Sequence, residues 1–442
     1  MSINIPQSPL PRVVIAGGGF GGLKLAQELD SRYFQVILID HHNYHQFPPL
    51  IYQVASSGLE PSSIAFPFRS ALRKKKGFVF RLAEVQGVAP ERNLLLTSVG
   101  EVKYDYLILA CGGTTNFFGN DQIARHSLPM KTLYESMNLR NVLLQNIEKA
   151  LVSDDEERRN ALLTVAIVGG GPSGVEIAGA LAEMKRYVLP KDYPYLDSSL
   201  FRIHLLDASP RLLQAMSERS SETAARGLRE MGVEIHTETM VSDYDGKTLR
   251  LSDGSEMKTR TVIWVSGIVA NAVEGIQAEA LGRGRRILVD EHNEVKGLTN
   301  VFAIGDQCLM TADANYPNGH PQLAQVAIQQ ARLLARNLRA RQEGKPLSPF
   351  HYKDLGSMAT IGRNRAVAEI RGAKWGGFTA WMLWLVVHLR SILSVRNKVI
   401  VLLNWIWNYV TYDRSLRLIL KRNIPVEPYH QREQRERREH EE

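Results

Sequence analysis

The feature that most constrains the fold of this chain is a glycine pattern that occurs twice. In each copy an apolar run predicts a buried strand, and three glycines follow it with the spacing G-x-G-x-x-G: Gly17, Gly19 and Gly22 in the first copy, and Gly169, Gly171 and Gly174 in the second. The first glycine of such a turn allows a sharp bend, the second lets the backbone approach a pyrophosphate, and the third lets the next helix pack closely on the strand. Two copies predict an α/β fold with two Rossmann-like dinucleotide-binding domains.

An acidic residue ends the second strand of each copy. Asp40 lies 23 positions after Gly17, and Asp207 lies 38 positions after Gly169 because a longer segment follows the helix. An acid about 20 residues beyond the turn is placed to accept hydrogen bonds from an adenosine ribose. The same charge repels a 2′-phosphate, so Asp207 favours NADH over NADPH. The alternative for Asp40 is a residue that only ends its strand.

The cysteines and histidines predict neither a disulfide framework nor a metal site. Cys111 and Cys308 are the only two cysteines and lie 197 positions apart, which favours a cytoplasmic setting. His41, His42 and His45 stand close together after the second strand, but no partner acids or thiolates follow them at ligand spacing. We interpret them as solvated loop histidines and expect no metal.

The positive charge of the chain is concentrated near its C-terminus. Residues 363–422 hold eleven Lys and Arg against two acids, and five of the six tryptophans lie in the same segment. This pattern disfavours a nucleic-acid partner for the body of the chain and favours an anionic membrane surface that contacts residues 375–422. The apolar runs WMLWLVVHL and VIVLLNWIWNYV are shorter than the ~18–20 residues of a spanning helix, so we expect amphipathic helices lying in the membrane plane. The alternative is a helix packed in a core or in a homodimer interface.

Further candidates for the site follow from local chemistry. Glu176 is expected in the first turn of its helix, where it either stabilises the helix dipole or faces the nicotinamide or the electron acceptor. Gly267 ends a strand at a turn where the backbone can approach the nicotinamide. Gly305 lets the backbone pass close to a ligand, and Asp306 can bind the hydroxyls of a flavin's ribityl chain.

Two glutamines lie on one face of a predicted amphipathic helix. Gln325 and Gln329 are four residues apart, which places them one turn from each other. Their residue type alone indicates solvated surface amides, and their shared face leaves a ligand-binding role open.

Several motifs together resemble those of the type II NADH dehydrogenases, which are single-subunit NADH:quinone reductases. The resemblance spans roughly residues 11–422 and is carried by VVIAGGGFGGL, NYHQFPPLIYQVASSG, AIVGGGPSGVEIAGAL, VFAIGDQ, the A-Q-x-A-x-Q run at 324–329, LGSMATIGRNRAVA, and the C-terminal WLVVHLRSIL and NWIWNY segments. It implies FAD in the first domain, NADH in the second, and a quinone that receives two electrons without proton pumping. It also implies a peripheral location on the cytoplasmic face of the cell membrane.

The resemblance assigns roles to individual residues. It implies that Gln325, with Gln329 on the same face, lies beside the flavin ring and the quinone head, and that Glu176 lies near nicotinamide and flavin. Ala324 and Ala110 are implied cofactor contacts, although Ala110 here belongs to A-C-G where the family more often has A-T-G. Some members carry a histidine where this chain has Ile328, so quinone protonation must use water or another group such as Glu176.

The predicted organisation is that of a two-dinucleotide flavoprotein with a C-terminal helical region. An FAD-binding domain occupies 11–125 and 286–345, an NADH-binding domain 126–285, a membrane-associating region 346–422, and a charged, solvated tail 423–442. The charged run at 153–160 is expected to be a connection into the second domain.

Three alternatives share parts of this pattern. A disulfide reductase is excluded and a sulfide:quinone reductase is disfavoured, because each needs a close pair of reactive cysteines. A flavoprotein without turnover, acting through its C-terminal helices, stays open.

Overall fold

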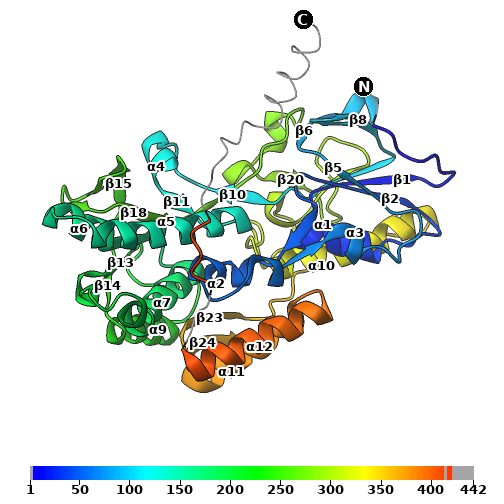
Figure 1. Cartoon of the computed structure of the whole chain (residues 1–442). Helices are drawn as coiled ribbons and strands as arrows, with labels where there is room; N and C mark the ends of the chain where they lie inside the picture. The colour runs from blue at the N-terminus through cyan, green and yellow to red at the C-terminus, as the bar shows by residue number, and fades with distance from the viewer. Residues whose placement is uncertain (1–2, 413–415, 421–442) are drawn as a thin grey trace, which may run out of the picture.

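The body of the molecule contains two five-stranded parallel sheets side by side (Figure 1). The computed structural model describes residues 3–412 and 416–420, so the predicted charged tail lies outside the described residues. The strand residues 13–15 and 165–167 are fully buried, as expected for parallel strands covered on both faces. The α/β class with two dinucleotide-binding folds is therefore confirmed.

The first sheet is assembled from two distant parts of the chain. Its order is β21-β9-β1-β2-β5, and all neighbours are parallel. The strands are β21 (Val301–Ala303), β9 (Tyr106–Leu109), β1 (Arg12–Ala16), β2 (Gln35–Asp40) and β5 (Val79–Leu82). Because β21 returns from beyond the second sheet to pair with β9, the topology supports a first domain in two parts. Helices α1 (Phe20–Glu28) and α10 (Ala324–Gln342) pack against each other on this sheet.

The second sheet repeats this arrangement with its own helices. Its order is β11-β18-β12-β13-β14, again parallel throughout. The strands are β11 (Leu128–Pro129), β18 (Thr261–Trp264), β12 (Thr164–Val168), β13 (Arg202–Leu206) and β14 (Val233–His236). One face packs on α5 (Leu133–Leu151), α7 (Pro172–Tyr187) and α9 (Glu218–Glu230), and the other packs on the small sheet of β15 (Val241–Tyr244), β16 (Thr248–Leu251) and β17 (Glu256–Lys258). The start of α5 is fixed by a capping box between Thr132 and Glu135.

Short elements complete both halves. The remaining sheets are β3 (Tyr44–Gln46) with β4 (Ala65–Pro67), β6 (Val85–Ala89) with β7 (Leu94–Thr97) and β8 (Gly100–Lys103), β10 (Gly113–Thr115) with β19 (Ile268–Ala270), and β20 (Ile287–Val289) with β22 (Cys308–Met310). The short helices are α2 (Ile51–Ala55), α3 (Phe68–Ala71), α4 (Asp121–His126), α6 (Glu156–Leu163) and α8 (Leu189–Asp192). The antiparallel pair β10–β19 joins the two segments that run between the large sheets.

Two elements of secondary structure were not predicted. Part of the charged connection at 153–160 is helical, because the Asp155 carboxylate accepts the Arg158 N–H and starts α6. The region 346–422 is not helical throughout, because it begins with an antiparallel sheet of β23 (Ser357–Gly362), β24 (Arg365–Ile370) and β25 (Ala373–Gly376). Strand alternation in this stretch is short and interrupted by glycines, which weakened its signal.

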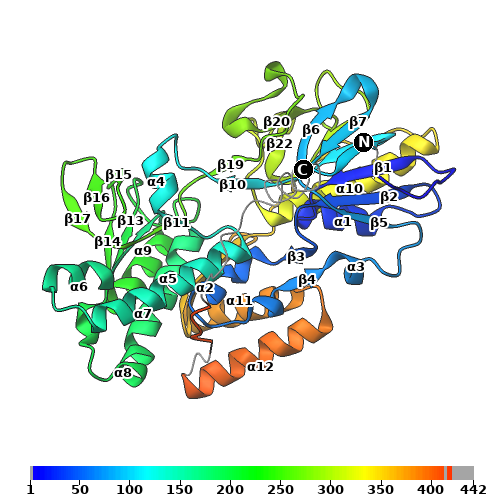
Figure 2. The same cartoon turned by 45° about the horizontal axis from the view of Figure 1, so that its top comes forward.

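Helices α11 (Gly377–Ser391) and α12 (Val395–Thr411) follow this sheet and lie together below α2 and β23 in Figure 1; Figure 2 also shows α12 beside α11 and below α2. Trp384 and Val401 are fully buried and belong to the same apolar core as α5 and α7. Part of the C-terminal region is therefore packed in the core, which was the alternative to helices lying in the membrane plane. Among the described residues, no helix is long and apolar enough to cross a membrane.

Helix α12 presents its polar side to the protein and its apolar side to the outside. The Asn397 amide donates to the carbonyls of Ser62 and Ala65, and the Asn408 amide donates to the carbonyl of Gly58. The outward face carries exposed apolar side chains at helical spacing: Val395, Val399, Leu403, Trp407 and Val410. This is the reverse of the usual arrangement of a surface helix.

Candidate functional site

The two glycine turns have the geometry that a dinucleotide needs. Gly17 and Gly169 have φ angles of +101° and +120°, which L-residues with side chains rarely adopt. A Cβ atom on Gly22 or Gly174 would overlap the carbonyl oxygen of Gly17 or Gly169 respectively. Next to Gly19 and Gly171, at the N-termini of α1 and α7, the space is open within 4 Å. Both turns thus fit a pyrophosphate at a helix N-terminus.

The acid that ends the second strand points back to the glycine turn in both halves. The Asp40 carboxylate accepts the N–H of Gly18 at 2.6 Å, and the Asp207 carboxylate accepts the N–H of Gly170. Each acid is thereby held beside the place where the nucleotide's ribose is expected. The longer spacing before Asp207 comes from α7, which is longer than α1, and from α8 and the loop after it, and it does not change this contact.

The histidines after β2 differ from one another. His45 is 5% exposed and its Nδ1 lies 3.1 Å from the Gly18 carbonyl oxygen, so the expectation of a solvated loop histidine is wrong for this residue. Burial lowers the pKa of His45, which keeps the ring neutral against the glycine turn. Donor atoms of Asp40, His41 and His42 lie within 4.8 Å of one another, but the Asp40 carboxylate is already bonded to the turn.

A group of residues from three segments meets at the carboxyl edge of the first sheet. Ala110 follows β9, and a Cβ on Gly17 would overlap its carbonyl group. The Gly305 N–H donates to the side chain of Gln330 at 2.8 Å, and Lys131 lies 3.3 Å from the Asp306 carboxylate. The structure therefore brings Ala110, Gly305 and Asp306 to the edge that carries the first glycine turn, where a flavin dinucleotide would extend.

Two glutamines at this edge were missed by the sequence analysis. Gln307 is fully buried, accepts the Cys111 N–H at 2.7 Å and donates to the Asn271 carbonyl at 2.9 Å. Gln330 is 1% exposed and donates to the Cys308 sulfur at 3.3 Å. A buried amide with two partners fixes loop positions, and the only sequence signal for Gln307 was its place in the VFAIGDQ motif.

Gln325 and Gln329 bind the segment that precedes β23. The Gln325 amide accepts the Leu355 N–H at 2.9 Å and donates to the Gly356 carbonyl at 3.2 Å. The Gln329 amide exchanges hydrogen bonds with the backbone of Lys353, at 2.9 and 3.1 Å. They are therefore not free surface amides, and Ala324, at the start of α10, lies at the same helix end. Their expected contact with flavin or quinone stays a prediction.

Gly267 lies in the turn between β18 and β19 with a φ of +77°. Strand β18 ends at Trp264, three residues before Gly267. The Gly267 carbonyl accepts the Asn116 N–H at 3.3 Å, and a Cβ on Gly267 would press on the Phe118 ring. The turn thus lies at the carboxyl edge of the second sheet.

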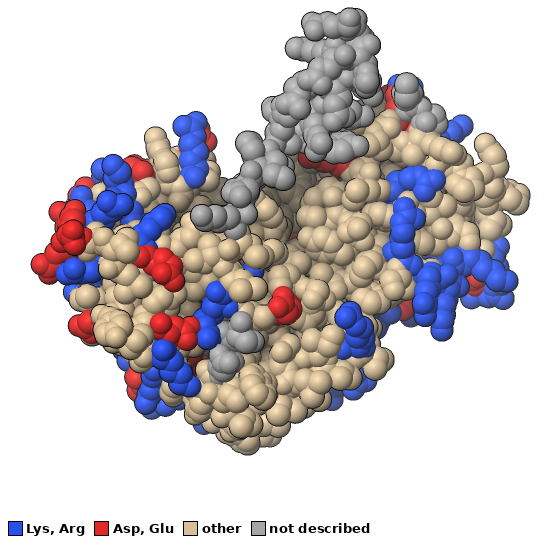
Figure 3. Space-filling model, viewed as in Figure 1, with Lys and Arg blue, Asp and Glu red and all other residues tan. Residues whose placement is uncertain are grey.

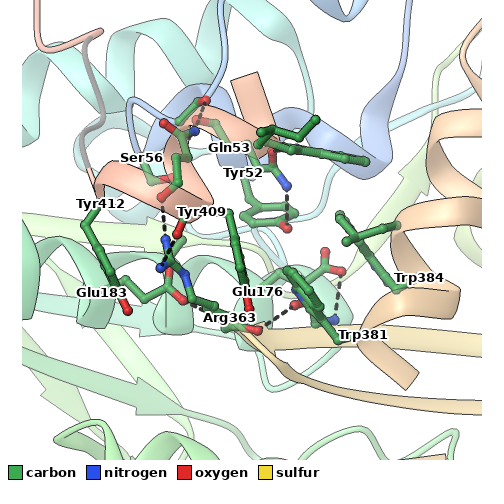
Figure 4. Close-up of a pocket in the computed structure, with 18 of the residues that line it drawn as sticks. Tyr52, Gln53, Ser56, Glu176, Glu183, Arg363, Trp381, Trp384, Tyr409 and Tyr412 are labelled. Atoms are coloured by element: carbon green, nitrogen blue, oxygen red, sulfur yellow. Dashed lines mark hydrogen bonds between the residues drawn. The ribbon is translucent and has the colours of Figure 1, made fainter. Parts of the chain in front are cut away.

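An elongated cavity of about 480 Å³ lies between α7, α2 and the C-terminal helices. Aromatic and aliphatic side chains dominate its lining, including Tyr52, Trp381, Trp384, Leu402 and Trp405. Figure 4 shows Glu176 and Trp384 at one end of this space and Glu183, Arg363 and Tyr412 at the other. Its size and apolar character suit a ring compound with a hydrophobic tail.

Glu176 is the acidic side chain buried deepest in this lining. It lies in the second turn of α7, so the expectation of a first-turn residue is wrong, and it is 9% exposed. The Thr360 N–H lies 3.4 Å from its carboxyl oxygen. Burial raises the pKa of Glu176 to about 8, while the Thr360 and Trp384 N–H groups act in the opposite direction. At neutral pH the group is therefore predominantly a protonated acid that can donate.

The mouth of the cavity is held by Arg363. Its guanidinium donates to the Tyr409 carbonyl at 2.9 Å and to the Asn408 carbonyl at the end of α12, and it lies 3.6 Å from the centre of the Tyr412 ring. Its backbone N–H donates to Glu183 of α7 at 2.5 Å. Arg363 thus joins α7, β23 and α12 around the opening.

Both cysteines are free thiols; Cys308 is buried, and Cys111 is partly exposed. Burial raises the pKa of Cys111 to about 12 and that of Cys308 to about 11, so neither is a thiolate at neutral pH.

Comparison with known proteins agrees with this geometry. Residues 11–331 match the pyridine nucleotide-disulphide oxidoreductase family, so the chain belongs to the class of flavoproteins with two dinucleotide-binding domains. Residues 355–412 match the NDH2 C-terminal domain. The chain is 37% identical to the type II NADH:quinone oxidoreductase Ndh of Mycobacterium tuberculosis, over 91% of this chain and 89% of that protein. It is therefore a member of the type II NADH:quinone oxidoreductase family, as the motifs indicated.

Solved structures show the same fold. NDH2 from Plasmodium falciparum in complex with NADH superposes with a TM-score of 0.85 at 20% identity, covering 93% of this chain and all of that chain. The sulfide:quinone oxidoreductase of Aquifex aeolicus has a TM-score of 0.70 at 16% identity, covering 93% and 96%. The shared fold therefore extends to a sulfide:quinone reductase, which is one of the alternatives considered from the sequence.

Proposed function

We propose that this protein is an FAD-dependent NADH:quinone oxidoreductase that binds FAD at the first glycine turn and NADH at the second. The observation that carries this is the apolar cavity beside α7, because the helix that starts at the second glycine turn also places Glu176 in that cavity. Bound FAD would supply the two-electron chemistry between donor and acceptor. That turnover occurs without proton pumping stays a prediction.

In this proposal the residues of the chain bind, orient and supply a proton. The cavity wall excludes water from the acceptor and holds it by apolar contact. Glu176, protonated at neutral pH, would donate a hydrogen bond or a proton to the acceptor, because Ile328 offers no proton. Gln325 and Gln329 would hold the 353–356 segment against α10 and thereby fix the position of β23 beside the site.

The direct test is the visible spectrum of the purified protein. NADH should bleach the yellow flavin absorption under anaerobic conditions, and a soluble quinone should restore it. A flavin that bleaches but is not reoxidised by quinone would contradict the acceptor assignment. A flavin that does not bleach would favour the flavoprotein without turnover.

The role of Gln325 can be separated from that of Gln329 by stopped flow. We expect Gln325→Leu to slow reoxidation by quinone more than reduction by NADH, with FAD retained. Gln329→Leu is the matched control, because it also releases the 353–356 segment. Equal losses in the two variants would leave both glutamines with a structural role only.

The finer partner and location assignments belong to the same proposal. We propose that the outward apolar face of α12, with exposed side chains of α11 such as Met382 and Val386, rests on an anionic membrane at its cytoplasmic face. Arg390, Arg396 and Lys398 flank this face, and each well-placed cation adds roughly 1 kcal/mol of attraction. In Figure 3 the corresponding lower surface is mainly uncharged, with Lys and Arg side chains at its border.

Truncation near Gly372 does not test the membrane proposal cleanly, because it would remove Trp384 and Val401 from the core. Point variants on the outward face do. We expect Leu403→Asp with Val410→Asp to abolish co-sedimentation with anionic liposomes while FAD stays bound. Val152→Asp, an exposed apolar residue elsewhere, is the control. If sedimentation persists but a homodimer dissociates, the face is a dimer interface instead.

A further inference from the structure

Three side chains with metal-binding chemistry meet on one face of the second sheet, away from the cavity. His204 lies on β13, and Glu234 and His236 lie on the neighbouring edge strand β14. The parallel register pairs His204 with Glu234, and residues two apart on a strand point to the same face. The backbone alone therefore gathers the three side chains.

Their donor atoms are already at the spacing of a tetrahedral metal site. His204 Nδ1 lies 3.2 Å from His236 Nε2 and 3.4 Å from Glu234 Oε2, and all three donor atoms lie within 4.8 Å of one another. In a tetrahedral zinc site with bonds of about 2.0–2.1 Å, neighbouring donor atoms are about 3.3–3.4 Å apart. Two of the three ligand separations match this value without movement of the chain.

The surroundings suit a cation held at the protein surface. The His204 side chain is 10% exposed, while the Glu234 side chain is 57% exposed and leaves one side of the cluster open to solvent. The carboxylate supplies one negative charge, and the nearby cations Arg202 and Lys185 partly offset it. A water molecule can complete the coordination from the open side.

We propose that His204, Glu234 and His236 form a binding site for a divalent transition metal ion of the Zn²⁺ type. Two imidazoles and one carboxylate favour Zn²⁺, Cu²⁺ or Ni²⁺ over Mg²⁺ or Ca²⁺, which prefer a cage of oxygen atoms. The expectation of no metal rested on the spacing of residues along the chain. This cluster forms between two neighbouring strands, whose paired residues His204 and Glu234 are 30 positions apart in the sequence.

The site lies next to the expected NADH-binding edge. The His236 carbonyl accepts the Asp207 N–H at 2.9 Å, and His204 lies on β13, which ends directly before Asp207. A bound ion would therefore stiffen the strand ends that carry the ribose-binding acid.

The test is a Zn²⁺ titration of the tag-free, FAD-loaded, full-length protein against a chromophoric chelator. We expect one equivalent of tightly bound Zn²⁺, and a higher unfolding temperature when Zn²⁺ is present. Co²⁺ in its place should give the visible absorption of a tetrahedral ion on the long-wavelength side of the flavin bands.

Single-ligand variants decide whether the cluster is responsible. Glu234→Gln and His236→Gln should each weaken binding at least about tenfold, since even indirect partners of a metal typically contribute ~10–100-fold. Glu234 is exposed, so its variant should fold normally in the absence of metal. His41→Gln, which alters the other histidine group, should leave the affinity unchanged. Unchanged affinity in Glu234→Gln and His236→Gln, or loss in His41→Gln alone, would overturn the proposal and leave a hydrogen-bonded histidine pair.

Discussion

The two glycine turns are nearly identical in backbone, yet the helices that follow them meet different surroundings. Helix α1 is covered by α10, whereas α7 is covered by β23, which approaches so closely that a Cβ on Gly179 would overlap the Ile361 carbonyl oxygen. The position equivalent to Glu176 in the first copy is Lys24, which forms a surface ion pair with Glu28 at 2.5 Å. In the proposed function, the first turn thus serves only its cofactor, whereas the second turn also delivers a side chain to the acceptor cavity. What packs outside a repeated motif decides which of its residues acquire a chemical role.

The largest effect should come from filling the tight glycine positions. Gly22→Ala and Gly174→Ala place a Cβ on a backbone oxygen, which costs about 1–3 kcal/mol or more. We expect Gly22→Ala to lose most of its FAD, and Gly174→Ala to retain FAD but to lose reduction by NADH. Flavin content and anaerobic reduction measure the two effects separately.

Gly19→Ala and Gly171→Ala are the matched controls, because a Cβ there meets open space. Both variants should unfold at the wild-type temperature, and each should weaken only the binding of the nucleotide at its own turn. Loss of FAD in Gly174→Ala with normal binding of NADH would reverse the assignment of the two turns.

The next effect concerns the pH dependence of stability. The pKa of Glu176 rises from an ordinary value of 4.5 to about 8 in the folded chain. Between these values the folded state binds more protons than the unfolded state, so the free energy of unfolding should fall with rising pH, by up to roughly 1.4 kcal/mol per unit. Glu176→Gln should flatten this slope in denaturant titrations at pH 5, 6, 7 and 8. A slope that stays the same would place the proton on another group.

A smaller effect separates the two acids. Asp207→Ser should lower kcat/KM for NADH relative to that for NADPH, by a factor equivalent to about 1–3 kcal/mol, because the charge at the ribose is lost. Asp40→Ser should leave this ratio unchanged and loosen FAD. Steady-state kinetics with both nucleotides, beside flavin content, distinguishes the two; an unchanged nucleotide preference in Asp207→Ser would refute the assignment.

The smallest effect is expected at Lys24. Lys24→Gln removes one exposed i,i+4 ion pair, so stability should change by no more than about 0.5 kcal/mol. Quinone reduction should be unaffected. A large loss of activity would show that the first helix also contributes to the acceptor site.

The sequence predicted the glycine turns and the elements that flank them, which depend on neighbours in the chain. The strands, the glycine turns and the acids at the strand ends are local patterns, and the structure has them where they were expected. The sequence identified Glu176 as a candidate, but it did not predict the surroundings of this side chain. Thr360 of β23 lies 184 positions away in the sequence, and Trp384 lies further still. His45 was misjudged for the same reason, because its partner is the glycine turn and not its own loop.

The C-terminal helices show a second limit. Asn397, Asn404 and Asn408 lie at helical spacing on one face of α12, but periodicity alone does not say which side faces the protein. The side chain of Asn397 is buried and donates to the carbonyls of Ser62 and Ala65, so the polar side of the helix faces the protein. An amphipathic pattern gives two faces, and only the partner of one of them decides the orientation.

The late return of β21 has a consequence for synthesis of the chain. Until residues 301–303 leave the ribosome, β9 is an edge strand with unpaired backbone groups, whereas the second sheet, from β11 to β18, is already complete. We expect the nucleotide-binding half that is translated second to mature first, and nascent chains that end before β21 to be prone to aggregation through the edge of β9. The N-terminal half of this protein is begun first and finished last.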